Sequence, residues 1–444
     1  MNTNDSTPPP SVNKKKASRP GSISDSMKLF VLQLRSLSVA LSPAMSALSK
    51  GLGRHAKDLD EFIKKNAKKL RERDGHVSFQ LSGDHIAEYE ALENSFKSYM
   101  LAYRNVPITF LVSLVSQYDA YIGNLLRNAY YLKPDMLNAS QRQLTFSELV
   151  QLNSVEAARE HLIEKEVESV LRTSHTEQFD WMESRFGIPL RKELHCWPVF
   201  IEVTERRNLF VHCDGIVSSQ YLSVCKSHSC KEALPDSGDM LGVKPKYFAQ
   251  AYRCLFELGV KLGQVLWRKL KPDEIEEADD NLNDICFDLL IEENFVLAEA
   301  LLHFAVNTLK HHSSDISRRV FVINYAIALK AQKNEAYKKL LEHEDWSSCR
   351  EDLQLAIAVL YDKYDEAVRI MKSIGRKGKP SESDYKSWPL FREFRQSEIF
   401  KKAYRSIFRR NFMIDETANP KEIKEGREQS VAGYVAQGAP PPEP

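Results

Sequence analysis

The sequence has no excess of charge of either sign. Its 444 residues include 62 Lys and Arg against 61 Asp and Glu, which leaves a formal net charge of +1. A protein that coats nucleic acid through a large basic surface usually carries a marked positive excess. The balance therefore argues against a general packaging role, although it permits a small, local phosphate-binding site.

The sequence also lacks a long uninterrupted apolar run. The longest runs, around Leu29–Val39 and Ile108–Val115, are shorter than the ~18 residues that a membrane span needs, and Arg35 interrupts the first. No secretory leader pattern opens the chain, and the seven cysteines are an odd number. Both features favour free thiols in a reducing compartment. We therefore expect a cytoplasmic protein without a membrane-spanning segment.

Signals for turns and strands are scarce as well. Glycine accounts for only 17 residues, and we find no convincing β-hairpin pattern. Between the two ends of the chain, apolar residues recur with the period of an α-helix. Hydrophobic residues make up 43% of the composition, which is enough to bury a core. The sequence therefore predicts an all-α fold.

Changes in composition divide the chain into five segments. Both ends are polar and contain proline clusters, and they have no periodic apolar pattern, so burial cannot offset the entropy lost on ordering. We expect a disordered tail over residues 1–25, a helical arm over 26–104, a helical bundle over 105–272, a repeat-like helical domain over 280–408 and a flexible tail over 409–444. The arm should contain three helices, one of them over Lys57–Arg73.

The bundle is expected to contain four main helices and one long insertion. Pro107 suits the first turn of a helix over Thr109–Tyr131. A helix over Leu190–Asp214 should end where Gly215 supplies the left-handed conformation that a C-cap favours. The remaining elements are helices over Ala157–Leu171 and Tyr247–Leu270, a short helix over Phe179–Phe186, and a polar insertion over Ser218–Pro245.

Alanines recur at a roughly regular spacing within residues 280–408. Ala298, Ala336 and Ala367 are 38 and 31 residues apart, near the ~34-residue period of tetratricopeptide repeats. Each stands in the second helix of an expected helix pair, where a small residue allows close approach. The segment resembles a tetratricopeptide-like array, although the Trp and Pro elements of that repeat are missing. An irregular helical domain is the alternative.

One short motif carries a chemical signal. Arg207-Asn208-Leu209-Phe210-Val211-His212 places a His after an Arg and four intervening residues, near the end of a predicted helix. This segment resembles the third helix of HEPN domains, whose signature is Arg, four to six residues, then His, often with Asn directly after the Arg. An acidic residue on the preceding long helix, here Asp119, fits the same pattern. The resemblance covers about residues 105–270.

Arg and His are residue types that metal-independent RNA cleavage needs. Histidine, with an unperturbed pKa of ~6.5, exchanges protons at working pH, and arginine presents a charged fork that matches phosphate oxygens. Asn208 lies one helical turn before His212 and would orient its imidazole. The resemblance implies an endoribonuclease that attacks RNA through the 2′-OH, often a toxin or antiviral effector, and it implies neither a cofactor nor a bound metal.

The angular positions of the two motif residues point to a second subunit. At ~100° per residue, Arg207 and His212 lie about 140° apart around the helix. Arg207 falls in an arc with Phe200, Val203 and Phe210, so it needs either an internal partner or a neighbouring subunit. HEPN domains generally dimerise through this helix and form a composite cleft. The resemblance therefore implies a homodimer with RNA as the substrate.

Each motif residue also has a structural interpretation. Arg207 could form a buried ion pair with Glu202, Glu205 or Asp119, and His212 could cap the end of the helix. Taken singly, either interpretation is about as well supported as the catalytic one. The joint occurrence of Arg207 and His212 at the family spacing favours the catalytic interpretation.

Arg206 is an alternative motif arginine, because a gap of five residues is still allowed. We prefer Arg207 because Asn follows it. The assignment is accordingly Arg207, His212 and Asn208 as catalytic residues, with Asp119, Glu205 and Arg206 supporting them.

Other functions remain as alternatives. The chain could be a non-enzymatic adaptor that dimerises through the bundle and binds RNA or a protein partner on the helical array, or a regulatory HEPN copy paired with a separate nucleotidyltransferase. Thiolates and an imidazole at Cys213, Cys225, His228 and Cys230 are ligand types that zinc accepts, but their spacing lacks the usual paired cysteines. We therefore expect free thiols there.

Overall fold

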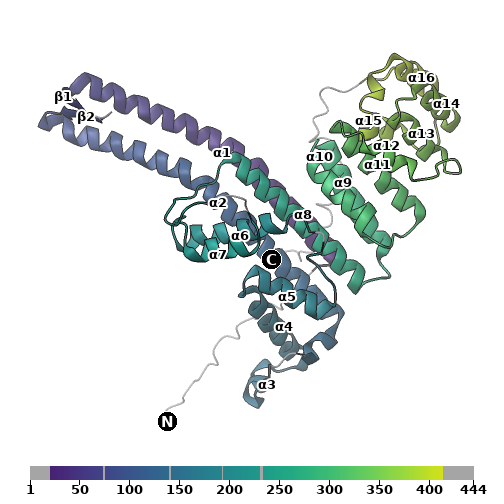
Figure 1. Ribbon diagram of the computed structural model, residues 1–444, viewed down its shortest axis with the longest axis horizontal. Coiled ribbons are helices and arrows are strands. Elements are labelled where there is room, and N and C mark those ends of the chain that lie inside the picture. Colours follow the sequence, from purple (N-terminus) through teal and green to yellow (C-terminus); the bar gives the residue numbers. More distant parts are fainter. Residues whose placement is uncertain (1–20, 74–75, 140–141, 193, 231–233, 414–444) are drawn as a thin grey trace, which may run out of the picture. The chain divides into compact units, whose positions relative to one another are not determined.

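The prediction of an all-α fold is confirmed. The computed structural model describes residues 21–73, 76–139, 142–192, 194–230 and 234–413. These residues form sixteen α-helices and a single two-stranded hairpin (Figure 1). They group into an N-terminal unit that ends at Leu282 and a C-terminal unit that begins at Asn283. Most of the two expected tails lies outside the described residues.

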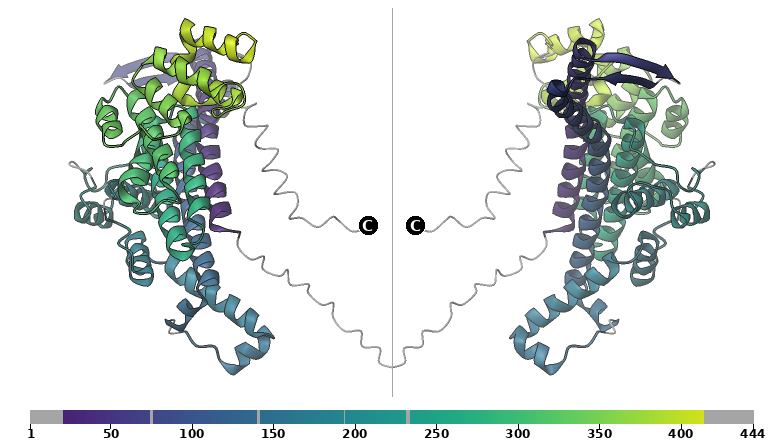
Figure 2. Two further views of the ribbon diagram at one scale, coloured as in Figure 1. Left: turned by 90° about the vertical axis from the view of Figure 1, so that its right-hand side faces the viewer. Right: turned by 90° about the vertical axis from the view of Figure 1, so that its left-hand side faces the viewer.

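Two long helices organise the N-terminal unit. The helix α1 (Ile23–Asn66) runs away from the bundle, and α2 (Ile86–Leu132) returns beside it (Figures 1 and 2). Ser22 and Asp25 begin α1 with reciprocal side-chain-to-backbone hydrogen bonds, which satisfy amide groups that the first turn leaves free. The helix thus starts inside the segment that the sequence assigned to a disordered tail.

A β-hairpin at the tip contradicts the expected third helix of the arm. The strand β1 (Lys68–Arg73) pairs antiparallel with β2 (His76–Gln80), so the predicted helix over Lys57–Arg73 is wrong beyond Asn66. The dipeptide Asp74-Gly75 stands between the strands. Asp-Gly is among the strongest sequence signals for a two-residue hairpin turn, so the sequence carried this information.

The helix start predicted at Pro107 is also wrong. Pro107 lies inside α2, which continues from Ile86 to Leu132, and Pro43 similarly lies inside α1. An interior proline removes one backbone hydrogen bond and disfavours the helix by ~3 kcal/mol. Packing along the rest of α2 therefore outweighs the local preference at this point.

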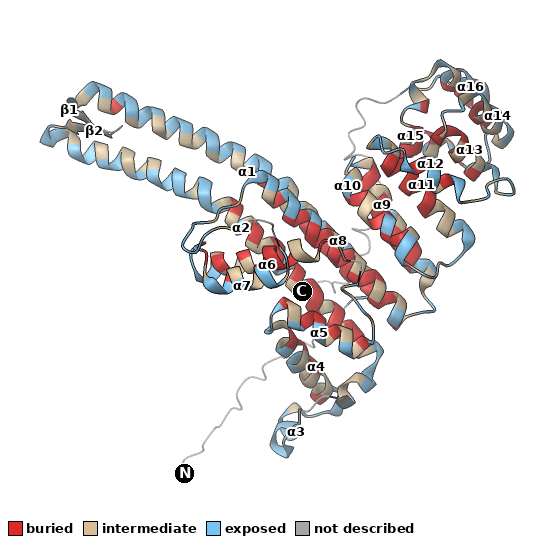
Figure 3. Cartoon of the chain, viewed as in Figure 1, coloured by how far each residue is buried: buried red, intermediate tan, exposed pale blue. Residues whose placement is uncertain are grey.

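The core of the N-terminal unit forms where α1, α2 and α8 (Pro245–Leu270) meet (Figure 3). At Gly259 the Phe30 ring of α1 occupies the space that a Cβ would need, and at Gly263 the Tyr121 hydroxyl and Met27 do so. The first part of α1 therefore belongs to the bundle, whereas the sequence placed it in a separate arm. Farther out, α1 and α2 are mostly exposed (Figure 3).

Shorter helices complete this unit. They are α3 (Phe146–Leu152), α4 (Val155–Leu171), α5 (His175–Phe186), α6 (Trp197–His212) and α7 (Ser219–Ser227). The expected polar insertion over Ser218–Pro245 is not a plain loop. Its Tyr221 and Cys225 are buried in a small apolar cluster with Leu209 of α6. The insertion therefore contributes to the core beside the motif helix.

One described helix, α1, is long and apolar enough by length and composition to cross a membrane. Met27, Phe30 and Leu34 of α1 are almost fully buried, but only 22% of the apolar window is buried in the N-terminal unit. The sequence prediction of no span rested on uninterrupted apolar runs, which are a stricter criterion.

The C-terminal unit is a stack of short helices. The helix α9 (Ile275–Ile291) contains the division between the units. The helices after it are α10 (Phe295–His303), α11 (Asp315–Ala331), α12 (Ala336–Glu342), α13 (Glu351–Leu360), α14 (Tyr364–Ile374), α15 (Glu382–Ser387) and α16 (Glu398–Phe408). Ala298 and Ala367 are fully buried, as a close approach of paired helices requires. Ala336 is exposed, so the repeat-like interpretation of that position is wrong.

We expect a Gly263→Ala substitution to destabilise the N-terminal unit. The added methyl group would lie 2.2 Å from the Tyr121 hydroxyl, and overpacking of this kind typically costs ~1–3 kcal/mol. Gly53→Ala in the exposed part of α1 is the control, because its methyl group meets nothing within 4 Å and the helix should gain ~0.5–1 kcal/mol. Urea unfolding of both variants measures the difference. Equal stability would contradict the close approach of α8.

Candidate functional site

The motif helix α6 is held firmly at both ends. Pro198 occupies its first turn, where the missing amide proton costs nothing. At the other end Gly215 has φ +80° and donates its backbone N–H to the Leu209 carbonyl at 3.1 Å. Gly215 is thus left-handed as predicted, but the predicted helix over Leu190–Asp214 is too long at both ends, because α6 begins at Trp197 and ends at His212, and Asp214 is already left-handed with φ 52°. Between these ends α6 packs on α2 and α8.

A single carboxylate connects three helices beneath the motif. Asp119 of α2 accepts a charged hydrogen bond from Nη2 of Arg207 on α6, with 2.9 Å between Oδ2 and the nitrogen. The other oxygen, Oδ1, lies 2.9 Å from Nε2 of His175 on α5. The ion pair between Arg207 and Asp119 is one of the partners that the sequence left open. Asp119 therefore sets the position of the Arg207 side chain.

His175 is the member of this group that the sequence analysis missed. Its side chain is 8% exposed, and its ring packs edge-on against Phe200 with 5.4 Å between centroids. Ser174 and Glu177 form reciprocal hydrogen bonds that start α5 directly before His175. This Ser-x-x-Glu pattern was visible in the sequence and locates the helix start. Nothing local connects His175 with Asp119, which is 56 residues away.

Glu205 and Asn208 extend the polar group along α6. Asn208 Nδ2 donates to Glu205 Oε1 at 3.4 Å, so the expected pairing of Asn208 with His212 is replaced by a different partner. Burial raises the pKa of the Glu205 carboxyl, while His175, Arg207 and the Asn208 amide oppose that rise. The site thus combines two carboxylates with a guanidinium and an imidazole.

Arg206 belongs to a different environment from its neighbour. It is 6% exposed and forms an ion pair with Glu202, itself 2% exposed, at 2.6 Å. Tyr221 and Tyr247 each donate a hydroxyl hydrogen bond of 2.7 Å to the same carboxylate, and Arg206 stacks over the Tyr247 ring. Every strong contact of this group is internal. Arg206 is therefore a structural residue and not part of the exposed site.

His212 lies apart from the other predicted residues. It is the last residue of α6 and is exposed. Within the described part of the chain, no side-chain hydrogen bond or ion pair of His212 is observed. The structure thus brings Arg207, Asp119, Glu205 and Asn208 together and leaves His212 facing solvent. The composite site formed by two copies of the chain stays a prediction.

The cysteines near the motif do not form a metal site with each other. Among the described residues, no group of three or more His, Cys, Asp and Glu side chains is placed to hold a metal ion. Cys225 is fully buried, and burial raises the pKa of its thiol to about 12. A thiol that resists ionisation is a poor metal ligand.

Comparisons with known proteins give no relative for this chain. No protein-family model matches it, and neither the curated proteins nor the solved structures contain a significant match. The function must therefore be argued from the residues of the site.

We expect substitution of the two neighbouring arginines to have very different effects. Arg206→Ala leaves the buried Glu202 without its cation, which typically costs ~3–5 kcal/mol. Arg207→Ala should cost about 1 kcal/mol, because its ion pair is partly exposed and Asp119 keeps His175 as a partner. Chemical denaturation followed by tryptophan fluorescence measures both. Comparable losses in the two variants would contradict the assignment of Arg206 to the core and Arg207 to the site.

The raised pKa of Glu205 predicts a pH-dependent stability. Its pKa in the folded chain lies above the ordinary value of 4.5, so the ionised carboxylate opposes folding at neutral pH. This penalty decreases as the pH falls through the folded pKa and disappears below 4.5. Glu205→Gln should therefore raise the free energy of unfolding at pH 7 and have little effect at pH 4. A stabilisation that grows toward acid pH would contradict the direction of the shift.

Proposed function

We propose that this chain is a HEPN-type, metal-independent endoribonuclease whose reactive residues are Arg207 and His212. The observation that supports it most is the fixed position of Arg207. Asp119 holds the guanidinium through one nitrogen, and about a fifth of the side chain, 21%, remains exposed. Its Nε is buried and has no hydrogen-bond partner in the described chain. That buried nitrogen is out of reach of a substrate, so a phosphate would have to bind the exposed part of the guanidinium that Asp119 leaves free.

The proposed reaction needs a base, an acid and a cation. The His212 imidazole takes the proton of a ribose 2′-OH, and the resulting oxyanion attacks the adjacent phosphorus. The bond from phosphorus to the 5′ oxygen breaks, and that oxygen takes up the proton that the His212 imidazolium gained in the first step. Arg207 stabilises the negative charge that develops on the phosphate oxygens. The products are a 2′,3′-cyclic phosphate and a 5′-hydroxyl end.

A second copy of the chain completes the proposed site. Arg207 faces Asp119 and the bundle, whereas His212 is exposed at the end of the same helix. Five residues of helix separate them by ~7.5 Å along the axis and about 140° around it. A dimer with α6 at its interface would set Arg207 of one copy near His212 of the other. Such a cytoplasmic enzyme would suit a toxin or an antiviral effector.

A non-enzymatic role is the second candidate, and one observation favours it. Arg207 already has an internal carboxylate partner, and the His175 ring shares that carboxylate. A purely structural role, in which this group holds α2, α5 and α6 together, would explain the same contacts. The bundle would then be a dimerisation module of an adaptor, and a protein or RNA partner would bind on the helices of the C-terminal unit.

We expect the purified full-length chain to cleave RNA in the presence of EDTA. His212→Ala should lower the cleavage rate ~100-fold to 10,000-fold, the usual contribution of general acid–base catalysis, while leaving the thermal stability unchanged, because His212 is exposed. His195→Ala replaces another exposed histidine of the same unit and should keep full activity. Gel analysis measures the rates, and mass spectrometry of the ends checks for the cyclic phosphate. Equal activity of the two variants would exclude the catalytic role of His212.

Mixing two inactive variants tests the composite site. If Arg207 of one copy acts with His212 of the other, a heterodimer of Arg207→Ala and His212→Ala retains one complete site. Random pairing should then restore about a quarter of the normal activity. Dimers that form without any recovered cleavage would favour the adaptor.

A further inference from the structure

The charge of the C-terminal unit is unevenly distributed along the chain. Residues 364–413 contain thirteen Lys and Arg against six Asp and Glu, a net charge of +7, whereas the whole chain carries only +1. These residues include α14 and α16, which pack against each other. The near-neutral total therefore hides a strongly basic region near the end of the described chain. Clustered positive charge is the usual mark of a surface that binds a polyanion.

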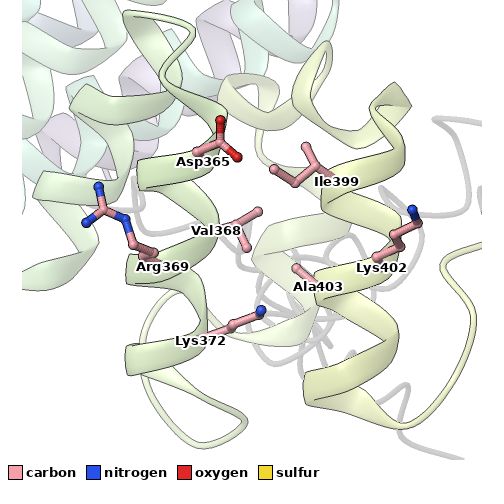
Figure 4. Close-up of a pocket in the computed structure, with 7 residues that line it drawn as sticks. All are labelled: Asp365, Val368, Arg369, Lys372, Ile399, Lys402 and Ala403. Atoms are coloured by element: carbon pink, nitrogen blue, oxygen red, sulfur yellow. The ribbon is translucent and has the colours of Figure 1, made fainter.

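A groove between α14 and α16 gathers part of this charge (Figure 4). Its volume is about 420 Å3. Arg369 and Lys372 belong to the lining from α14, one helical turn apart, and Lys402 belongs to it from α16. The Lys372 ammonium points between the two helices, whereas Arg369 and Lys402 point outward on either side, at the rims of the groove (Figure 4). Asp365 is the one carboxylate among the lining residues, so cations predominate.

The three cations form no direct ion pair in the described part of the chain. Arg369, Lys372 and Lys402 are all exposed and form no ion pair there. Nearby basic residues differ in this respect, because Lys401 pairs with Glu398 and Arg410 pairs with Glu382. The positive potential of the groove is therefore only partly offset from within the unit, by Asp365 in the lining and by Glu398, whose charge also acts on Lys402.

The apolar residues that line the groove are Val368, Ile399 and Ala403, and only Ile399 among them is partly exposed. Val368 and Ala403 at its base are 7% and 1% exposed, so a partner could reach little of them. Of the large apolar residues in 364–413, only Met413 is strongly exposed. A protein interface usually relies on buried apolar or aromatic anchors, whereas the phosphate backbone of nucleic acid needs only cations. Nucleic acid therefore fits this surface better than an acidic protein.

We propose that the groove between α14 and α16 binds the phosphate backbone of single-stranded RNA. The choice of RNA over other nucleic acids rests on the proposed endoribonuclease function. Arg369, Lys372 and Lys402 contact successive phosphates, and no aromatic residue lines the groove to stack on bases. Binding is therefore independent of base sequence and strongly dependent on salt. This surface captures substrate without taking part in the chemistry.

Charge reversal of the groove tests this proposal. The probe is a fluorescent uridine 20-mer, and the protein is the full chain with His212→Ala, so that cleavage does not interfere. The triple substitution Arg369→Glu, Lys372→Glu and Lys402→Glu should weaken binding at least ~10-fold near 0.1 M salt, and should reduce the slope of log affinity against log salt by about 2. Fluorescence anisotropy measures both quantities. The corresponding glutamine variants serve if the glutamate variant does not fold.

A matched control separates a local site from a general effect of charge. Lys310, Lys333 and Lys339 of the same unit are exposed and form no ion pair among the described residues. Their reversal changes the net charge by the same amount and should leave binding nearly intact. Equal losses in both triple variants would overturn the proposal. So would a polyglutamate of matched charge that binds as tightly as RNA, because the surface would then suit an acidic protein.

The two proposals can fail separately. Anisotropy measures groove binding in a variant that needs no activity. If the chain proves inactive but still loses RNA affinity on charge reversal, the groove proposal is supported and the nuclease proposal is excluded. Conversely, if the chain cleaves RNA but binds it equally well after charge reversal, the nuclease proposal is supported and the groove proposal is excluded.

Discussion

The close approach of α8 to α1 and α2 is the contact on which the N-terminal unit depends. Two positions without side chains, Gly259 and Gly263, admit Phe30, Met27 and the Tyr121 hydroxyl into the space that Cβ atoms would fill. Tyr121 also donates a hydrogen bond of 3.2 Å to the Gly259 carbonyl. Because α6 packs against both α2 and α8, this contact determines how far Asp119 of α2 lies from the motif helix. The geometry of the site therefore depends on how α2, α6 and α8 pack together.

Adjacent residues of α6 meet very different surroundings because successive side chains point ~100° apart. Arg206 turns into the bundle, where Glu202 and two tyrosines compensate its burial. Arg207 turns toward Asp119 and keeps part of its surface in solvent. The same motif thus supplies one residue for stability and one for the proposed chemistry. Removing a cation from a closed, buried group leaves a charge that water cannot reach, which a partly exposed pair does not.

Parts of the fold and site could be predicted because their signals are local. Helical periodicity and the left-handed conformation of Gly215 follow from residue type and spacing, whereas the sequence offered three possible acids for Arg207 and did not choose among them. The hairpin over residues 68–80 was missed because its first strand is highly charged and continues a helical pattern, although Asp74-Gly75 marks a turn. Pro107 misled the prediction because its local preference is weaker than the packing of a helix as long as α2. The burial of Tyr221 and Cys225 could not be read from a stretch whose composition is polar.

By itself, the sequence determined the helical class of the chain, the motif and the residue types available for phosphate chemistry. It also determined the excess of Lys and Arg over Asp and Glu in residues 364–413. Only the tertiary structure decided that Asp119 joins Arg207 to His175, residues 88 and 56 positions away along the chain. It likewise decided that Arg369, Lys372 and Lys402 share one groove. Contacts over such separations depend on how whole helices pack, and helix packing is determined by the summed burial of many side chains rather than by any short pattern.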